Sequence, residues 1–413
     1  MRLTRGEEEI LAGGWGGPAR RALEMQIEVG GFFAAERMVR VTSAHLTGDA
    51  DSMGDAGLGY VEALARDGGR FVVPTTTNAR NVDFECYRAL GQPEDVAARE
   101  RRLRDLVVQM GAVALDTCAN YQTLSPPRFG EHLAWGDTGT VIFANAVAGA
   151  RSNFEGGPAS YAAALTGRVP AYGMHLDERR RGTHRVLVRD QPRSVSDWGA
   201  LGVLVGRRLT NYWLVPVFTG LEVEPSADGL KQLGATLASY GSLAMFHIVG
   251  VTPEARTLDE AFGGRTPRQT LTVEPGDLDR VYRAFVPEAP EVDVVVFGTP
   301  HLSLFEVRHL AELLRGKRVH AGTRLYLTTN AHVRGMAERL GYAEAIQAAG
   351  GTILAGPCFY IMTPRILAEL HGLRNLVTDS AKLANIIPAA GYHPVLRPTE
   401  ECVEAAVRGR IER

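Results

Sequence analysis

Two of the four cysteines stand where a thiolate could bind iron. Cys118, in the segment ALDTCANYQT, directly follows a predicted strand, and Cys358 has the same kind of position in ILAGPCFYIM. A thiolate at an exposed strand end can ligate iron, whereas a buried cysteine normally acts as a small apolar residue. Because the chain has no CxxC pair, any metal site must be assembled from distant segments. Metal binding and simple burial both stay open for these two residues.

The segment NAVAGARSNFEGGPASYAAALTGRVPAYGMHLDERR places a guanidinium and two amides in one glycine-rich loop. It begins at Asn145 and contains Arg151 and Asn153. A guanidinium binds a carboxylate through two parallel hydrogen bonds, and glycines let a backbone approach a ligand closely. The segment therefore predicts an acid-binding loop. The alternative is a glycine-rich connection in which Arg151 pairs with Glu155 on the surface.

His301 lies just beyond another predicted strand, in VVVFGTPHLSLFEV. A histidine on this constrained turn could act as an acid, as a base or as a residue that orients a ligand. The same residues favour a helix start, in which Ser303 caps the helix and Glu306 completes a capping box. Both interpretations can hold together.

Two further polar loops follow strands. VPTTTNARNVDF contains Thr76, and TDSAKLANIIP contains Ser380 and Lys382. Hydroxyl groups and an ammonium could hold the carboxylate and hydroxyl of a small acid. Ordinary turn closure is the alternative, with Ser380 capping a helix. His45, in SAHLTGD, gives a weaker indication.

Short β-branched runs that alternate with helical patterns must position these loops. This alternation is typical of βαβ units and predicts an α/β fold of several lobes, with mainly parallel sheets flanked by helices. A helix is also expected to begin at Pro158. The expected helices include 93–110, 278–285, 331–349 and 365–371. The expected strands are 40–43, 71–74, 112–116, 140–144, 213–218, 243–249, 293–297, 325–328, 352–354 and 376–378.

Composition narrows the class of protein. With 413 residues and 45% hydrophobic content the chain can bury a large core. We expect an N-terminal α/β lobe over 1–250 and a C-terminal α/β lobe over 251–413, or a single unit built from both. The 45 basic and 47 acidic residues give no reason to expect nucleic acid as a partner. The chain has neither a membrane span nor a secretion signal, so we expect a cytoplasmic protein.

Taken together, the loops resemble the aconitase X family, in the same order and across nearly the whole chain. The matching segments are NAVAGARSN with EGGP, YGMHLDER, GTPHLSLFE, DTCANYQT and TDSAKLANIIP. The resemblance implies the large part of an aconitase-like fold without the swivelling domain. It therefore implies a separate small subunit as partner, one that would carry the catalytic serine of the aconitase plan.

The resemblance also implies a hydro-lyase that dehydrates a small hydroxylated carboxylic acid at an iron–sulfur cluster. Cys118 and Cys358 match the expected ligand positions. Some relatives have a cysteine where this chain has Thr299, so a cluster held by three cysteines does not follow. Cys86 is a candidate third ligand. A 2Fe-2S, 3Fe-4S or 4Fe-4S cluster and a single iron ion all stay open.

By the same resemblance, Arg151 is expected to clamp the substrate carboxylate. Further polar contacts are expected from Asn145, Asn153, Thr76 and Ser380. Proton transfer or charge stabilisation is expected from Lys382 and His301.

The TPH segment looks more like the bacterial enzymes that act on cis-3-hydroxy-L-proline than like the archaeal phosphomevalonate dehydratases. A phosphate site would also need basic residues, for which Arg80, Arg168 and the run from Arg179 to Arg181 are the candidates. Three alternatives stay open. They are a phosphomevalonate dehydratase large subunit, a non-catalytic binding or scaffold subunit without a cluster, and a metal-free lyase or isomerase.

Overall fold

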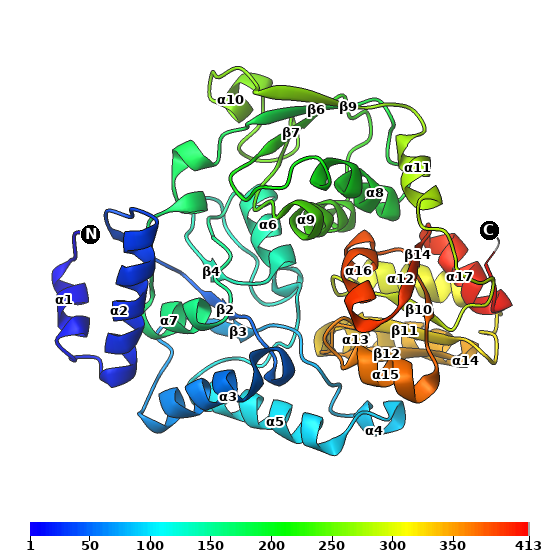
Figure 1. Ribbon diagram of the computed structural model, residues 1–413, viewed down its shortest axis with the longest axis horizontal. Coiled ribbons are helices and arrows are strands. Elements are labelled where there is room, and N and C mark those ends of the chain that lie inside the picture. The colour runs from blue at the N-terminus through cyan, green and yellow to red at the C-terminus, as the bar shows by residue number, and fades with distance from the viewer. Residues whose placement is uncertain (412–413) are drawn as a thin grey trace.

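The computed structural model is built on parallel sheets flanked by helices, as the sequence predicted (Figure 1). It describes residues 1–411. Three of its sheets are wholly parallel, and a short antiparallel pair joins β1 (Met38–Arg40) to β5 (Arg168–Pro170). Within residues 1–411, no helix combines the length and apolar character needed to cross a membrane.

The first parallel sheet has the strand order β3-β2-β4. Helices α3 and α5 pack together over its core, where Leu64 and Leu103 are buried. The strands are β2 (Ala44–Leu46), β3 (Thr75–Thr77) and β4 (Ala134–Trp135). The helices of this region are α1 (Arg5–Leu11), α2 (Gly17–Phe32), α3 (Ala50–Arg66), α4 (Tyr87–Leu90), α5 (Glu94–Gln109), η1 (Asn120–Gln122), α6 (Thr138–Ala146) and α7 (Pro158–Thr166).

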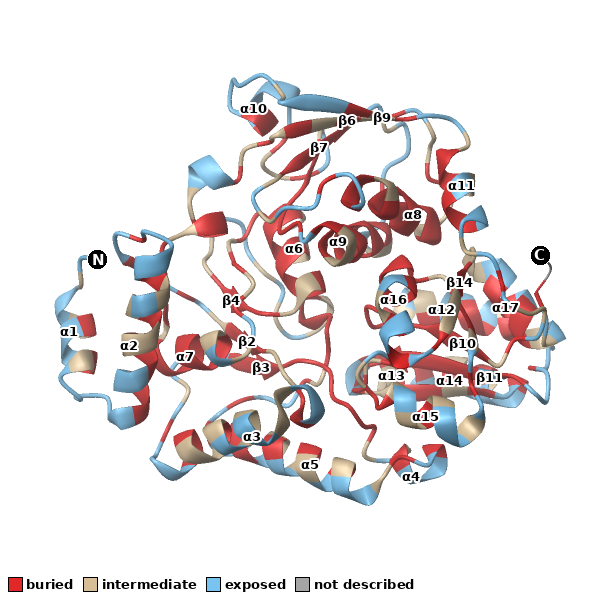
Figure 2. Cartoon of the chain, viewed as in Figure 1, coloured by how far each residue is buried: buried red, intermediate tan, exposed pale blue. Residues whose placement is uncertain are grey.

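The second sheet has the order β8-β7-β6-β9 and packs on the helix pair α8 and α9, which Figure 2 shows almost wholly buried. The two helices can approach closely because Gly202 has no side chain. A Cβ at this position would lie only 2.7 Å from the Cβ of Thr236. The strands are β6 (His184–Val188), β7 (Pro216–Thr219), β8 (His247–Ile248) and β9 (Gln269–Val273). The helices are η2 (Gly173–His175), η3 (Asp177–Arg179), α8 (Val195–Gly206), α9 (Ala227–Gly241), α10 (Leu258–Phe262) and α11 (Asp277–Arg283).

The third sheet has the order β12-β11-β10-β13-β14. The chain builds outward from β10 through β11 to β12, then crosses to the other side of β10 to add β13 and β14. The strands are β10 (Val294–Phe297), β11 (Arg324–Thr329), β12 (Gly351–Ala355), β13 (Asn375–Thr378) and β14 (His393–Leu396). The helices are α12 (Leu304–Leu314), α13 (Ala331–Arg339), α14 (Tyr342–Ala349), α15 (Pro364–His371), α16 (Ala381–Ile386), η4 (Ile387–Ala390) and α17 (Thr399–Arg408).

The reversal between β10 and β13 determines where a ligand can enter the third sheet. Open parallel sheets bind ligands beyond the carboxyl ends of their strands, at the point where the strand order reverses. The loop after β10 carries Thr299 and His301, and after β13 come Ser380, which caps α16, and Lys382, in the first turn of that helix. Four of the residues of interest therefore follow the two strands at which the order reverses.

Several sequence predictions of strands need correction, including 243–249, where only β8 forms. Residues 140–144 are not a strand but the centre of α6, which Asp137 caps by accepting a hydrogen bond from the Gly139 amide. This short apolar run is buried on nearly every side, and periodicity cannot separate such a helix from a buried strand. Residues 71–74 are not a strand, and strand pairing begins one residue later, at β3. Within 112–116, only Val113 pairs with a neighbouring strand, through a single bridge to Thr76. The division into lobes 1–250 and 251–413 stays a prediction, and its boundary falls within the second sheet.

Candidate active site

The loops that follow strands of the first and third sheets meet, and they bring Cys118 and Cys358 into one electrostatic environment. Cys118 is buried on the loop after Val113, and Cys358 is partly buried just after β12. Burial and the charge of the Cys358 thiolate both raise the pKa of the Cys118 thiol. Burial also raises the pKa of the Cys358 thiol. A cation bound to both sulfurs would oppose these shifts, because cations favour the thiolate form.

Arg80 joins the two cysteine loops. Its Nε donates to the Asp116 carboxylate at 2.8 Å, and its backbone N–H donates to the Gly356 carbonyl at 2.9 Å. Its Nη1 donates to Glu100 at 3.1 Å. The guanidinium and Glu100 are both buried, so the positive charge of Arg80 is neutralised by carboxylates of the protein itself.

Two residues of the loop after β10 contact the sulfurs. The Thr299 hydroxyl lies 3.7 Å from Cys358 Sγ, and the backbone N–H of His301 donates to Cys118 Sγ at 3.3 Å. Burial lowers the pKa of His301 to about 4, so its ring is neutral near neutral pH. The expected capping box is confirmed, since Ser303 accepts from the Glu306 amide and Glu306 accepts from the Ser303 amide.

Lys382 places a positive charge beside the two cysteines. Its Nζ donates to the Thr138 hydroxyl at 3.0 Å and lies 4.0 Å from an oxygen of Asp137. Burial disfavours the charged form, but Asp137 and the two thiolates outweigh burial and raise the pKa of Lys382. The ammonium form therefore predominates at neutral pH.

Several buried polar groups near this place lack a hydrogen-bond partner among residues 1–411. His45 is linked to Thr76 through Nδ1 at 2.7 Å, and its Nε2 has no partner. The side-chain oxygen of Asn78, both amide atoms of Asn120 and the hydroxyl of Tyr121 also have none. Buried polar groups are normally satisfied, so such groups mark where a ligand or ordered water binds.

Sequence reasoning gave little weight to these residues or missed them. Asn78 directly follows β3, and Asp137 follows β4 with one residue between them. This strand-end position was the signal that could have identified them. For His45 the signal was weaker, because the residue lies within β2 and only its burial beside Asp137 reveals it.

Arg151 is held in a different place. Its Nη1 donates to the His175 carbonyl at 3.1 Å, and its Nη2 forms an ion pair with Asp177 at 2.5 Å. The side chain of Asn145 bonds to the backbone of Ser152 and Ala244.

Asn153 likewise bonds to the backbone of Tyr172 and Met174, in the same turn that holds Arg151. The structure therefore holds Arg151 and Asn153 at the 172–177 turn, and Asn145 contacts the neighbouring Ser152. None of these hydrogen bonds or ion pairs reaches the cysteine loops, and the predicted carboxylate clamp stays a prediction.

Ser380 and Cys86 complete the predicted set. Ser380 caps α16 by accepting from the Leu383 amide at 3.1 Å, and its hydroxyl donates to the Thr299 carbonyl. Cys86 begins α4 beside Asp83, where burial and the Asp83 charge raise its pKa to about 11. Among residues 1–411, no three His, Cys, Asp or Glu side chains are grouped closely enough to hold a metal ion. Cys86 therefore does not join Cys118 and Cys358.

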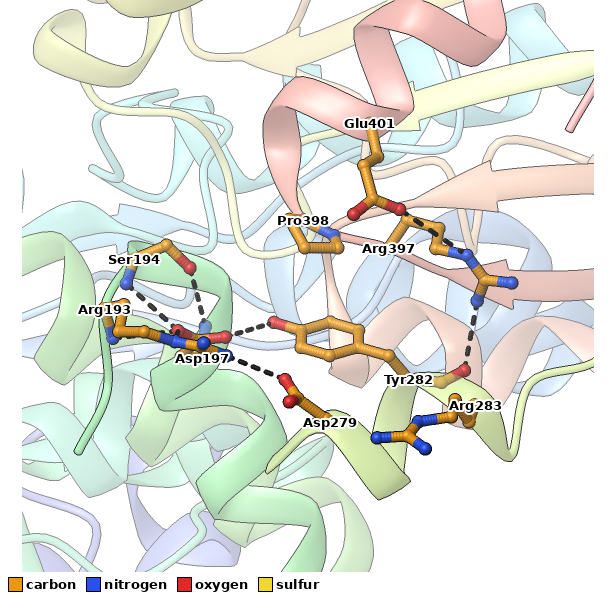
Figure 3. Close-up of a pocket in the computed structure, with 9 residues that line it drawn as sticks. All are labelled: Arg193, Ser194, Asp197, Asp279, Tyr282, Arg283, Arg397, Pro398 and Glu401. Atoms are coloured by element: carbon orange, nitrogen blue, oxygen red, sulfur yellow. Dashed lines mark hydrogen bonds and ion pairs between the residues drawn. The ribbon is translucent and has the colours of Figure 1, made fainter. Parts of the chain in front are cut away.

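A separate cleft of about 660 Å³ lies between α8, α11 and the start of α17 (Figure 3). Most of its charged groups pair with one another. Arg193 pairs with Asp279 at 2.7 Å, and the Tyr282 hydroxyl donates to Asp197 at 2.9 Å. Arg397 donates to the Tyr282 carbonyl at 3.0 Å. The cleft joins the second and third α/β regions, and its contacts indicate a structural junction.

Comparison with known proteins decides the family. Models of the first, second and third domains of aconitase X match residues 1–178, 182–283 and 292–408. The chain belongs to the aconitase X family. Its fold matches the holo-form crystal structure of aconitase X from Thermococcus kodakaraensis with a TM-score of 0.88 and 34% identity, over 98% of this chain and 100% of that one.

Curated aconitase X relatives are hydro-lyases. The phosphomevalonate dehydratase large subunit of Methanothermobacter thermautotrophicus is 37% identical, over 94% of each chain. That of Thermococcus kodakarensis is 34% identical, over 98% of this chain and 100% of the relative. The cis-3-hydroxy-L-proline dehydratase of Pseudomonas aeruginosa is 36% identical, over 99% of this chain and 70% of the relative. The name "large subunit" implies a partner subunit for the archaeal proteins.

The aconitase X family suggests an iron–sulfur cluster, and the donor atoms present here limit its type. Two soft thiolates and the Thr299 hydroxyl surround one place, and His301 donates an amide N–H to one of the sulfurs. This set fits iron held by two cysteines, with other ligand positions left to oxygen donors. A cubane held by three thiolates would need a third cysteine, and Thr299 stands at this place instead.

Proposed function

We propose that this chain is the large subunit of an iron-dependent hydro-lyase that removes water from a small hydroxylated carboxylic acid. One observation supports this most strongly. Two thiols, an ammonium group and several unpartnered buried polar atoms converge where the strand ends of two sheets meet. Dehydration requires these components, since a hydroxide must be stabilised as it leaves and a carboxylate must be held.

Each residue has a distinct role in this proposal. Cys118 and Cys358 would hold the iron, which when bound acts as a Lewis acid toward the leaving hydroxyl. Lys382 keeps a positive charge at the site and stabilises negative charge on the substrate. His45, with Thr76 fixing its ring, offers an unpartnered ring nitrogen to the polar groups of the acid.

The substrate is proposed to be cis-3-hydroxy-L-proline. A phosphorylated acid would need free guanidinium groups, and three of the five arginines that could have bound a phosphate pair with carboxylates instead. Arg80 pairs with Glu100 and Asp116, and Arg168 pairs with Glu7 at 3.0 Å.

Arg180 pairs with Glu254, and Arg179 stacks on Trp213. The alternative substrate is 5-phosphomevalonate, which the similarity to three archaeal large subunits favours.

A separate small subunit with the swivelling domain is proposed as the partner. The Pseudomonas aeruginosa dehydratase contains further sequence, since the match covers 70% of its length but 99% of this chain. The small subunit would supply the remaining part of the site. We place the pair in the cytoplasm, where free cysteines such as the four of this chain stay reduced.

The proposal is tested by producing the chain with its small subunit under anaerobic conditions. We expect iron in the purified pair, a visible absorption from iron–sulfur bonding, and loss of water from cis-3-hydroxy-L-proline. 5-Phosphomevalonate is measured in parallel, and turnover of that acid alone would select the alternative substrate. A pair with neither iron nor turnover would instead favour a non-catalytic scaffold subunit. Full turnover after complete removal of iron would indicate a metal-free enzyme.

The carboxylate clamp predicted for Arg151 has its own test. We expect Arg151→Ala to leave KM nearly unchanged, because the guanidinium is held by the His175 carbonyl and Asp177. The lost exposed ion pair should lower the free energy of unfolding by ~1 kcal/mol or less. Steady-state kinetics and chemical denaturation measure the two effects. A KM raised more than about tenfold, equal to ~1.4 kcal/mol of binding, would support the clamp.

A further inference from the structure

The His301 side chain connects the two cysteine loops. Its Nδ1 is hydrogen-bonded to the hydroxyl of Thr117, the residue before Cys118, at 3.0 Å. Its Nε2 is hydrogen-bonded to the carbonyl of Pro357, the residue before Cys358, at 2.8 Å. A carbonyl only accepts, so Nε2 carries the proton and Nδ1 accepts from the threonine hydroxyl. Both ring nitrogens are therefore occupied by protein groups, and the ring is fully buried.

The backbone of His301 is also hydrogen-bonded on both sides. Its N–H donates to Cys118 Sγ at 3.3 Å, and its carbonyl accepts from Lys231 Nζ at 3.2 Å. Lys231 is a buried residue of α9, and its charge is balanced by Asp228 at 3.1 Å and by Glu306. The helix pair of the second region thus fixes the peptide that faces the sulfur.

We propose that His301 is a positioning residue that fixes the spacing of the Cys118 and Cys358 loops, and that Lys231 holds its peptide against Cys118. This inference rests on the proposed iron site. A ring with both nitrogens committed to the protein has no free position for a substrate proton, so proton transfer belongs to another group. Groups that orient metal ligands commonly change metal affinity 10- to 100-fold when they are lost.

Two substitutions at His301 separate positioning from acid–base catalysis. Gln places an N–H donor where Nε2 lies and can keep the bond to the Pro357 carbonyl, whereas Ala removes both bonds. We expect His301→Ala to weaken binding of ferrous iron by about 10- to 100-fold. We expect His301→Gln to recover most of that affinity and most of the turnover of the wild-type pair. Thr117→Val, which removes one of the two ring contacts with little change of shape, should give an intermediate loss of iron affinity.

Iron affinity is measured by competition between the full-length chain and a chelator, with the visible spectrum as a second readout. The exposed His332 provides the control, and His332→Ala should match the wild type. Wild-type iron affinity in both His301→Ala and Thr117→Val would overturn the inference. So would His301→Gln with normal iron content and turnover reduced by about a thousandfold or more, which would indicate an acid–base role. A wild-type chain that binds no iron would instead refute the proposed function.

Discussion

Replacing Cys118 with serine is expected to abolish stable iron binding and to lower turnover of the assembled enzyme by about a thousandfold or more. A Lewis acid contributes several kcal/mol to stabilising a leaving hydroxide, which corresponds to a factor of this order. Serine occupies nearly the same volume as cysteine, so the buried loop should keep its shape. Iron content, visible absorption and kcat are the measurements.

Cys402 offers a matched control for this variant. It is also a fully buried cysteine, but it packs in the core of the third region and donates to the Arg397 carbonyl at 3.3 Å. Cys402→Ser should therefore keep the iron content and turnover of the wild type. If Cys118→Ser also kept its iron, the thiol pair would not be the metal site.

Much of the fold could be predicted because its parallel strands are short, β-branched and followed by polar loops. The run from Val294 to Phe297 and the strand that ends at Thr378 were recognised in this way. The error over 140–144 has a physical cause. A helix buried on nearly all its faces has no polar side to reveal its period, and Asp137, its capping residue, was not noticed.

Part of the candidate site was predictable because its residues lie within a few positions of a predicted strand end. Cys118, Cys358 and Lys382 belong to this group, and the structure brings them together. Arg151 shows the limit of such reasoning, because residue types do not reveal that a nearby turn already satisfies its guanidinium. The pairing of His45 with Thr76 depends on the register of β2 and β3, which sequence periodicity does not determine.

Residues from all three α/β regions contribute to the candidate site around Cys118 and Cys358. The first region provides Cys118 and Asp137, the second holds the His301 peptide through Lys231, and the third provides Cys358 and Lys382. Iron binding would then couple the first and third regions, since each donates one thiolate. The structure therefore predicts that iron stabilises the packing of these regions as well as activating the substrate.

Replacing Lys382 with methionine is expected to lower kcat by about 100- to 1,000-fold while iron stays bound. Loss of one preorganised group that stabilises developing charge typically has an effect of this size. The thiolates are unchanged, so the metal should remain, and methionine fills the volume of the lysine stem. Steady-state kinetics and iron analysis on the same preparation separate the two effects.

Lys317 is the matched control, because it is an exposed lysine in an ion pair with Glu404 at 3.6 Å. Lys317→Met should leave kcat and iron content unchanged. Lys382→Arg keeps the positive charge beside Asp137 and should retain more activity than Lys382→Met if charge is the essential property. Equal and severe losses of kcat in Lys382→Met and Lys382→Arg would mean that the shape of the ammonium group matters more than its charge. Normal turnover in Lys382→Met would place the charge of this residue outside the reaction altogether.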